Sequence, residues 1–568
     1  MAQFGPTLPI SQELHATKYR SPGETFDEAM CRVSGALGDD DRHFRAFLRL
    51  LRRQQFMPAG RVQSAMGAPR AVTPYNCFVS GVIEDSMASI MKRAGEAAET
   101  MRRGGGIGYD FSRIRPRKSL IRSMGSSASG PRSFMDIFDS VCGTISSAGE
   151  RRGAQMGVLR IDHPDIEIFI GAKQNETDLR RFNISAGVID SFMHALLRGE
   201  TFDLVFEGEV FSTVSAQALW DKLMRATWDW AEPGVLFLDT INRMNNLYYC
   251  ETISASNPCA EQPLPPFGAC LLGSFNLAQY VIPNGQGGWT FDRAAFQADI
   301  PVVVRAMDNV VDRAVYPLPE QEIEAKSKRR MGLGYTGLAN TGEALGFAYG
   351  SDGFDDFHHF VGRTLMNEAY RASALLAAEK GPFPLFDREK FLDGNFVKRL
   401  DPDVRDLIAK HGIRNSHLTS IAPTGTISLC ADNVSSGIEP VFMPQYERTI
   451  QTADGPRKEI IQDYGVRVFG TEPRTAEELS IKDHLQALLT ASQYMDSAVS
   501  KTCNIGDDVT WDEFKQVYVD AWRGGAKGCT TFRRAGKRYG ILNAAPSSEE
   551  NQGAACYIDP ETGKKTCE

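Results

Sequence analysis

The chain has 568 residues, of which 42% are hydrophobic, and its formal net charge is -8. That length and hydrophobic content can bury one large core or about two to four ordinary domains. A general nucleic-acid binder usually carries a basic face, so the negative balance argues against polymeric nucleic acid as a partner.

The N-terminal part of the chain predicts helices. Residues 1–10 have neither the basic start nor the apolar stretch of a signal peptide, and no later run approaches the roughly 18 apolar residues that cross a bilayer. We therefore expect a cytoplasmic protein without membrane contact. Helical periodicity runs over about residues 11–55, with a turn at 21–24. Residues 1–75 are predicted to form a helical N-terminal region.

From Asn76 onward, short apolar runs such as 77–79 and 202–206 alternate with long amphipathic stretches. This alternation is typical of α/β architecture. We expect a catalytic α/β domain over residues 76–542. Residues 543–568 are rich in small and polar residues and predict a flexible tail.

Three glycine-rich stretches are candidates for binding anionic groups. Residues 332–337 have the spacing of a dinucleotide fingerprint, but the charged run 324–330 cannot be the buried strand that this motif requires, so we reject that interpretation. Residues 104–108 either admit a ligand to the backbone or end a helix. Residues 422–428 follow an apolar run, 418–421, and open a plausible helix, so they predict a phosphate site or an ordinary Ser/Thr cap.

The cysteines favour redox or catalytic roles. There are eleven, too scattered for a disulfide scaffold, and none forms a Cys-x-x-Cys pair. A closed structural zinc or iron-sulfur site therefore has little support. In a reducing compartment, the thiols that matter are catalytic or cycle through redox states.

The most distinctive cysteine lies in Asn257-Pro258-Cys259-Ala260-Glu261. Pro258 makes a helix interior unfavourable here. In an extended segment Asn257, Cys259 and Glu261 share one face and offer an amide, a thiol and a proton acceptor to one small substrate. A buried structural cysteine beside a turn is the alternative interpretation.

Taken together, these motifs resemble the catalytic chain of the ribonucleotide reductases, over about residue 9 to the end. Several long motifs in the family's order make the resemblance specific. Besides the pentapeptide, they are Tyr75-Asn76-Cys77-Phe78 and residues 104–108, 151–157, 268–277, 422–428 and 435–440. The resemblance implies a ten-stranded α/β barrel, which strand spacing alone would not identify.

The resemblance also implies a radical mechanism. Cys259 would form a thiyl radical that takes the 3′-hydrogen of the ribose. Glu261 would accept the 3′-OH proton as general base, and Asn257 would orient the ribose hydroxyls. Cys77 and Cys270 would supply the two electrons that replace the leaving water.

Further residues follow from the same resemblance. Cys556 and Cys567 would carry electrons from a thioredoxin-like or glutaredoxin-like reductant, although they are separated by ten residues, and two unpaired surface thiols are the alternative. A deoxynucleotide effector at a subunit interface implies a homodimer, with Asp85, Arg122, Arg151 and Arg152 as effector contacts. The substrate would be held, largely through backbone groups, by Asn76, Gly106, Pro423, Thr424, Gly425, Thr426 and Ile427.

The radical source separates the subclasses. The metal-radical class uses adjacent tyrosines where this chain has Gly528-Cys529-Thr530-Thr531-Phe532-Arg533, and no C-terminal glycyl-radical motif is present. The remaining resemblance is to the adenosylcobalamin-dependent class. Because no Asp-x-His-x-x-Gly motif occurs, we expect no protein side chain to ligate the cobalt.

The sequence thus predicts adenosylcobalamin-dependent reduction of ribonucleotides, with diphosphates as the expected substrates. Two alternatives stay open. One is a metal-radical reductase chain that needs a separate radical-generating subunit. The other is a nucleotide-binding regulator without catalysis, which would be expected to lack Asn257, Cys259 or Glu261, yet all three are present.

Overall fold

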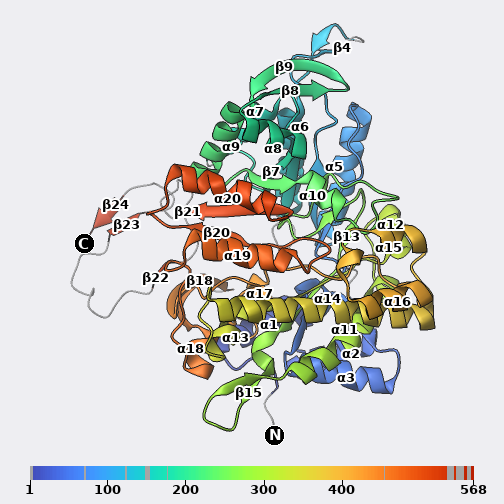
Figure 1. Ribbon diagram of the computed structural model, residues 1–568, viewed down its shortest axis with the longest axis vertical. Helices are drawn as coiled ribbons and strands as arrows, with labels where there is room; N and C mark the ends of the chain where they lie inside the picture. Colours follow the sequence, from blue (N-terminus) through green and yellow to red (C-terminus); the bar gives the residue numbers. More distant parts are fainter. Residues whose placement is uncertain are drawn as a thin grey trace.

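The computed structural model describes residues 4–69, 72–121, 124–146, 154–175, 177–452, 455–533, 543–544, 556–558 and 565–567. Figure 1 shows β-strands in the middle of the molecule with helices above and below them. Helices α5 to α9 lie at one end, and the N-terminal helices lie with α11 and α14 at the other. Within the described part of the chain, no helix has the length and apolarity needed to span a membrane.

The predicted N-terminal helices are confirmed as α1 (Pro9–Tyr19), α2 (Phe26–Leu37) and α3 (Asp41–Arg52). A capping box between Thr25 and Glu28 starts α2, and the predicted turn is closed by a bond from Glu24 N–H to Ser21 O of 3.0 Å. The region also contains a strand, β1 (Phe56–Pro58), which pairs with β14 (Leu272–Asn276). It is therefore helical with one strand added.

The larger sheet has eight strands. Five neighbouring strands run parallel: β2, β3, β6, β7 and β10. On the two sides of this parallel set, β13 pairs antiparallel with β2 and β21 pairs antiparallel with β10, and β20 then pairs parallel with β21. Their order is β13 (Ala269–Cys270), β2 (Cys77–Val79), β3 (Gly106–Asp110), β6 (Gln155–Arg160), β7 (Phe182–Val188), β10 (Gly234–Phe237), β21 (Gly528–Arg533) and β20 (Thr502–Ile505).

A second sheet continues from the first. Its order is β1, β14 and β17 (Gly332–Thr336), and β14 follows β13 after one residue, Leu271. Parallel bridges then join Leu333 to Thr419 and Ile421 to Val499. Strand pairing therefore passes stepwise from β17 through residues 418–421 to the residues just before β20.

The glycine-rich stretches take the structures that their surroundings demand. Residues 332–336 are themselves the strand β17, and the charged run before them belongs to the end of helix α12 (Pro319–Lys328), so the rejection of a dinucleotide fingerprint is confirmed. Helix α5 (Met87–Arg102) ends before Gly104, and β3 begins at Gly106. Residues 425–429 form the predicted helix, α17 (Gly425–Leu429).

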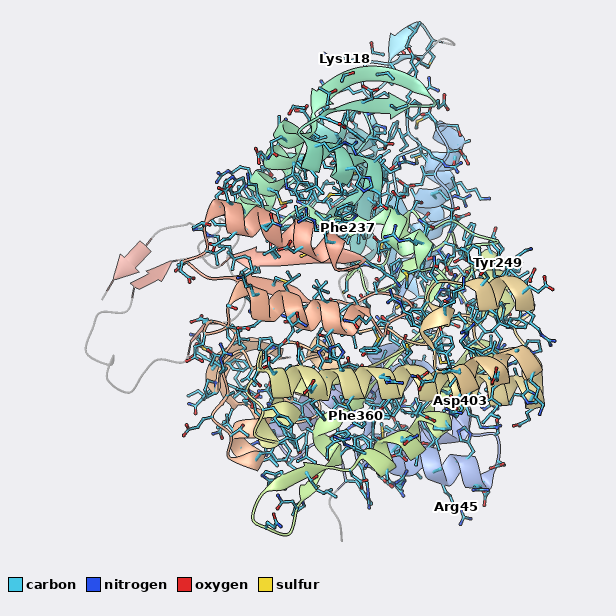
Figure 2. The ribbon with its side chains drawn as sticks, in the orientation of Figure 1. Arg45, Lys118, Phe237, Tyr249, Phe360 and Asp403 are labelled. Carbon is cyan, nitrogen blue, oxygen red and sulfur yellow. The ribbon has the colours of Figure 1, made fainter. Side chains whose placement is uncertain are left out.

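Two large apolar clusters flank the sheets. One packs α2, α3, α11 and α14 together, and the other packs α5, α6, α8, α9 and α20. Figure 2 shows Phe237 of β10 near the middle of the molecule and Arg45 of α3 at its lower margin. The other helices are α4 (Gly60–Ala65), α6 (Pro131–Ser146), α7 (Ile166–Ile170), α8 (Asp190–Arg198), α9 (Ala216–Trp230), α10 (Leu238–Arg243), α11 (Arg293–Arg313), α13 (Leu338–Ala344), α14 (Asp352–Lys380), α15 (Arg388–Asp393), α16 (Pro402–His411), α18 (Tyr464–Phe469), α19 (Ile481–Ser492), α20 (Trp511–Arg523), η1 (Leu277–Tyr280) and η2 (Val397–Arg399).

The remaining strands form small hairpins and edges. The predicted strand 202–206 is confirmed within β8, which pairs with β9. The predicted tail lies mostly outside the described residues, but its β22 pairs with β18, and its β23 pairs with β24. These strands are β4 (Leu120–Ile121), β5 (Ser126–Ser127), β8 (Thr201–Phe206), β9 (Glu209–Ser215), β11 (Ala255–Ser256), β12 (Pro263–Leu264), β15 (Val281–Pro283), β16 (Trp289–Phe291), β18 (Gln445–Thr452), β19 (Gly455–Gln462), β22 (Asn543–Ala544), β23 (Cys556–Ile558) and β24 (Lys565–Cys567).

Candidate active site

The pentapeptide lies at the tip of a hairpin formed by β11 and β12. Ala260 N–H donates to Asn257 O (3.0 Å), and Ala260 takes a left-handed φ of 64°. The prediction of an extended segment is therefore wrong, because Pro258 occupies the second position of a tight turn, where its φ is favourable. The turn buries Asn257 and Glu261 and leaves Cys259 exposed.

The hairpin tip is held from two sides. On the first sheet, Asn183 Nδ2 of β7 donates to Pro258 O (2.8 Å), and Gly108 of β3 lies against Ser256, where an added Cβ would be 1.8 Å from the carbonyl oxygen. On the opposite side, Ala498 N–H and Ser420 Oγ both donate to Glu261 O, each at 2.9 Å. The catalytic candidates therefore lie between β3 and β7 of the larger sheet on one side and Ser420 and Ala498 on the other.

Two of the predicted redox cysteines face each other. Cys77 on β2 and Cys270 on β13 are direct register partners, and both are buried. Gly106 completes this corner, because an added Cβ would lie 3.2 Å from both Cys77 Sγ and Pro258 Cγ. Burial raises the pKa of Cys270 well above its usual value, and the nearby Glu261, Cys77 and Cys259 act in the same direction. The structure thus brings all three thiols and the carboxyl together.

Glu261 is a buried carboxyl with unsatisfied hydrogen-bonding capacity. Burial raises its pKa to about 7, and the neighbouring Asn257 amide acts in the opposite direction. Among the described residues, no hydrogen-bond partner reaches Glu261 Oε2, Asn257 Nδ2 or Asn76 Oδ1. Buried polar atoms without partners are rare in folded proteins, so these three atoms indicate a place for a polar ligand.

The predicted phosphate turn leads into α17. Thr424 adopts a left-handed φ of 53°, and its hydroxyl accepts from Gly437 N–H (2.7 Å) and contacts Thr336 Oγ1 (3.0 Å). That hydroxyl is therefore already engaged within the protein. Gly425 and Thr426 are exposed, and the first N–H groups of a helix lack intrahelical partners. The backbone is thus the part of the turn that is open to a ligand.

Several supporting residues escaped the sequence analysis. Ser420 and Ala498 hold Glu261, Asn183 holds Pro258, and Thr336 holds Thr424. Two of them lie in stretches with a sequence signal, Thr336 in the glycine-rich residues 332–337 and Ser420 in the run 418–421 before the phosphate turn. The others are small residues far away in the sequence, and nothing local distinguishes them.

The effector candidates are only partly described. Arg122, Arg151 and Arg152 lie outside the described residues. Asp85 pairs with Arg115, whose Nε lies 2.5 Å from its carboxylate and whose backbone N–H also donates to it (3.2 Å). The Asp85 carboxylate is therefore held in place by two bonds from one residue.

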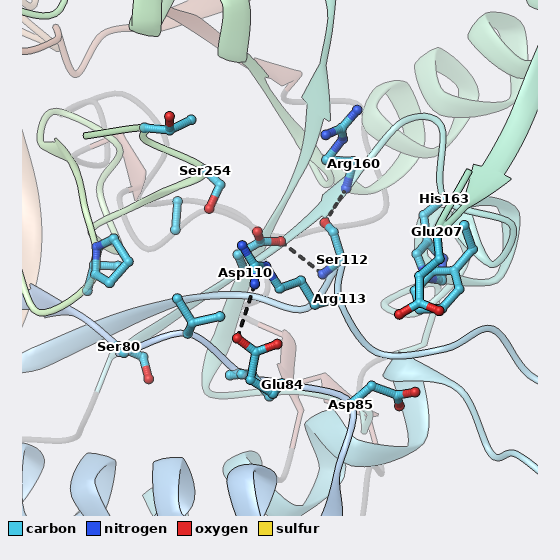
Figure 3. A pocket seen from close by; sticks show the side chains of 18 of the residues that line it. Ser80, Glu84, Asp85, Asp110, Ser112, Arg113, Arg160, His163, Glu207 and Ser254 are labelled. Atoms are coloured by element: carbon cyan, nitrogen blue, oxygen red, sulfur yellow. Dashed lines mark hydrogen bonds and ion pairs between the residues drawn. The ribbon is translucent and has the colours of Figure 1, made fainter. Parts of the chain in front are cut away.

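Asp85 also lines a cavity of about 590 Å³ (Figure 3). The cavity lies at the carboxyl ends of β2, β3 and β6 and reaches Ser254 at the stem of the catalytic hairpin. On its wall Arg113 pairs with Glu84 (3.1 Å), and Ser112 Oγ accepts from Arg160 N–H (2.9 Å).

The remaining candidates lie at the C-terminal end. Cys556 and Cys567 are direct register partners in the antiparallel pair of β23 and β24, so the hairpin closes the ten-residue gap between them. On β21, Thr531 bonds Tyr518 OH (2.8 Å), whereas Thr530 is exposed.

Comparison with known proteins gives a consistent answer. The family model described as "Ribonucleotide reductase, barrel domain" matches residues 75–468 and 471–532. The vitamin B12-dependent ribonucleoside-diphosphate reductase of Mycobacterium tuberculosis (strain CDC 1551 / Oshkosh) is 36% identical over 561 residues, which cover 92% of this chain and 78% of the relative. The enzyme of the same name from Thermoplasma acidophilum is 33% identical over 82% of this chain and 62% of its own length. The vitamin B12-dependent ribonucleotide reductase of Streptomyces clavuligerus is 30% identical over 86% and 60%. The chain therefore belongs to the ribonucleotide reductase family.

Proposed function

We propose that the chain reduces ribonucleotides to 2′-deoxyribonucleotides by a thiyl-radical reaction that adenosylcobalamin initiates. The observation that carries the proposal is the meeting of Cys259, Glu261 and the opposed thiols of Cys77 and Cys270 at the hairpin tip. The relatives are named vitamin B12-dependent reductases, which supports both the activity and the cofactor. The chain is thus an oxidoreductase.

Three residues of the hairpin tip act on the ribose. Cys259 takes the hydrogen atom from C3′ and later returns it. Glu261 accepts the proton of the 3′-OH, and a pKa of about 7 suits this task, because the group is partly ionised and still basic near neutral pH. Asn257 donates its open Nδ2 to a ribose hydroxyl.

Cys77 and Cys270 supply the reducing equivalents. Loss of the 2′-OH as water requires two electrons and two protons, and joining two thiols in a disulfide releases both. The products are one deoxyribonucleotide, one water and one disulfide. The raised pKa of Cys270 keeps this thiol protonated, so it enters the reaction as a hydrogen donor.

The surroundings of Cys259 fit a cofactor that reaches the thiol directly. Cys259 is exposed whereas Cys77 and Cys270 are buried, so of these three thiols it is the one open to a bulky group. Thr530 and Thr531 of β21 have no redox-active ring that could relay a radical from a distant subunit. When bound, adenosylcobalamin supplies the radical that removes the hydrogen atom of Cys259. We expect no protein side chain to ligate its cobalt.

The turn before α17 holds the substrate phosphates in this proposal. Gly425 and Thr426 are exposed at the start of α17, and the free N–H groups at a helix start attract anions. Pro423 and Ile427 flank these groups. Diphosphates are the proposed substrates, because two of the relatives are named ribonucleoside-diphosphate reductases.

The tail resets the disulfide between Cys77 and Cys270. The register of β23 and β24 supports this role, because it brings Cys556 opposite Cys567, as a dithiol pair requires. A thioredoxin-like or glutaredoxin-like protein would then reduce the tail. A buried disulfide inside the catalytic domain would be out of reach of such a large reductant.

The two sheets form a ten-stranded α/β barrel in this proposal. The order of strand pairing supports closure. Pairing runs from β2 to β10, continues through β21, β20, residues 418–421 and β17, and returns to β2 through the consecutive β14 and β13. The catalytic hairpin then occupies the barrel interior. Such closure would explain why the hairpin tip touches strands from both sets.

A homodimer with a deoxynucleotide effector completes the proposal. Met87 and Met91 on α5 are 56% and 51% exposed, and Gly95 continues the same helix face. An exposed apolar stripe of this kind supports an interface between two copies. Asp85 lies just before this helix and would contact the effector, together with Arg122, Arg151 and Arg152.

The decisive experiment uses the purified chain alone with adenosylcobalamin, CDP and dithiothreitol. We expect dCDP, and we expect Cys259→Ser to abolish both turnover and 3′-hydrogen exchange while CDP still binds. Turnover only after addition of a radical-generating subunit would favour the metal-radical class. No turnover with CDP or CTP under either condition would favour a regulator without catalysis.

A further inference from the structure

We propose that Lys527 is a positioning residue of the active site, because its Nζ fixes the segment 495–498 that in turn holds Glu261. The inference concerns a residue just before β21 that is not among the candidates described above. It rests on the proposed function for its kinetic test.

Three backbone carbonyl groups cluster around the amino group of Lys527. Its Nζ donates to Met495 O (3.3 Å) and, more closely, to Asp496 O and Ser497 O. Burial lowers the pKa of Lys527 to about 7, and the nearby Asp496 carboxylate acts in the opposite direction. In its protonated form the amino group has three N–H donors, one for each of these carbonyls. Within the described part of the chain, no other donor bonds these three oxygens, and the surroundings are buried.

The segment 495–498 also contacts the catalytic hairpin. Ala498, the next residue, donates its N–H to Glu261 O (2.9 Å). The Asp496 carboxylate accepts from the N–H groups of Leu418 (2.6 Å) and Thr419 (3.1 Å), which aligns the segment with the strand that carries Ser420. Both donors that hold Glu261 O therefore depend on how residues 495–498 lie.

The backbone of Lys527 is itself held in place. Its own carbonyl accepts from Phe237 N–H (2.9 Å) at the end of β10, near the middle of the molecule in Figure 2. The side chain thus connects residues 495–497, which lie beside the strand of residues 418–421, to a backbone position that is bonded to β10 of the larger sheet. Without the amino group, three buried carbonyls lose their partner and the segment must shift to find water.

A shift of this segment would move Glu261 and the turn that carries Cys259. Reactions that need close alignment lose about a hundredfold in rate when a reacting group moves by about 1 Å. Lys527 does not contact the turn before α17, but the segment 495–498 reaches the strand that leads into this turn, because Ile421 N–H donates to Ala498 O (3.1 Å). The expected signature is therefore a loss in kcat that exceeds any change in KM.

The test compares Lys527→Met with Lys501→Met in the full-length protein with adenosylcobalamin and CDP. Methionine keeps the length of the side chain and removes its donors. We expect Lys527→Met to lower kcat by about tenfold or more and to change KM by a clearly smaller factor. Lys501 is the matched control, since it is also buried and has three partners, Glu439, His484 and Thr502 O, which do not bond Glu261. Its variant should keep kcat within about threefold of the wild type.

Three outcomes would overturn the inference: an unchanged kcat in Lys527→Met, an equal fall in both variants, or a fall confined to KM. If Lys527→Met does not fold, Ser420→Ala removes one hydroxyl from the same support of Glu261 and should lower kcat about threefold at constant KM. An unchanged kcat there would also count against it. Lack of turnover in the wild type would instead contradict the proposed function itself.

Discussion

Burial is what gives single residues of this site their chemical character. Glu261 is enclosed by the hairpin and the strands that hold it, which raises its pKa to about 7. Cys270 is enclosed as well, and its thiol stays protonated. Cys259, two residues from Glu261, is exposed. One short turn therefore holds an exposed thiol and a buried carboxyl with a raised pKa, as the proposed roles of Cys259 and Glu261 require.

The pKa of Glu261 predicts how activity depends on pH. Below about pH 7 the carboxyl binds a proton and cannot accept another from the 3′-OH, so kcat/KM for CDP should fall as pH decreases through this value. Initial rates measured from about pH 5.5 to 8.5 would reveal this limb. Values of kcat/KM that stay constant down to about pH 5.5 would contradict this role, because they would mean that the carboxyl titrates near its usual pKa.

The same shift predicts a stability effect of Glu261→Gln. Between about pH 4.5 and 7 the folded protein retains a proton that the unfolded chain has released, so the carboxyl lowers stability as pH rises through this window. The neutral amide removes that penalty. We expect the variant to be inactive, yet more stable than the wild type by about 1–3 kcal/mol at pH 8 and equally stable at pH 4. Urea unfolding at both pH values measures this.

The exposed Glu209→Gln on β9 serves as control and should change stability at neither pH. A Glu261→Gln variant that is less stable than the wild type at pH 8 would mean that the carboxylate has a favourable partner in the folded protein.

Among the secondary structure elements, the close approach of β3 to the catalytic hairpin is the most sensitive. Gly108→Ala should be destabilised by about 3 kcal/mol or more and lose activity. An added Cβ would lie 1.8 Å from Ser256 O, and this backbone atom cannot turn away as a flexible side chain could. Gly35→Ala in α2 is the matched control. Its Cβ meets nothing within 4 Å, so it should stabilise the protein by about 0.5–1 kcal/mol. Denaturant midpoints and CDP turnover of both variants test this, and an active, stable Gly108→Ala would show that the hairpin can move away.

The elements also show what the sequence could predict. The helices of residues 11–55, the strands at 77–79 and 202–206, and the helix after the phosphate turn follow from local patterns, and they are confirmed. The extended conformation expected for residues 257–261 is wrong, because Pro258 disfavours a helix interior but is as typical of tight turns as of extended segments, and the turn was only the alternative interpretation. The sequence does not predict how the hairpin is held. Its contacts span long stretches of sequence, and periodicity carries no information on such contacts, which involve Gly108, Asn183, Ser420 and Ala498.

For the whole molecule, the tail separates two routes of reduction. Cys556→Ser should lower turnover supported by a thioredoxin-type protein about tenfold or more, because the tail can no longer exchange a disulfide. Turnover with dithiothreitol should persist, since a small reductant reaches Cys77 and Cys270 directly. Steady-state rates with each reductant measure the difference.

The exposed Cys250→Ser is the matched control and should leave both rates unchanged. Equal loss with both reductants in Cys556→Ser would point to damage in the catalytic domain. Unchanged turnover with the protein reductant would remove the tail pair from the mechanism.

The position of the hairpin tip between two sets of strands has a consequence for the folding pathway. Its contacts join residues 256–261 to Gly108 and Asn183 on one side and to Ser420 and Ala498 on the other. Contacts so distant in the chain form slowly, since the intervening segments must first be ordered. The tip can therefore be seated only after most of the protein has folded. A partly folded chain therefore lacks the arrangement of Cys259 and Glu261 that the proposed reaction needs.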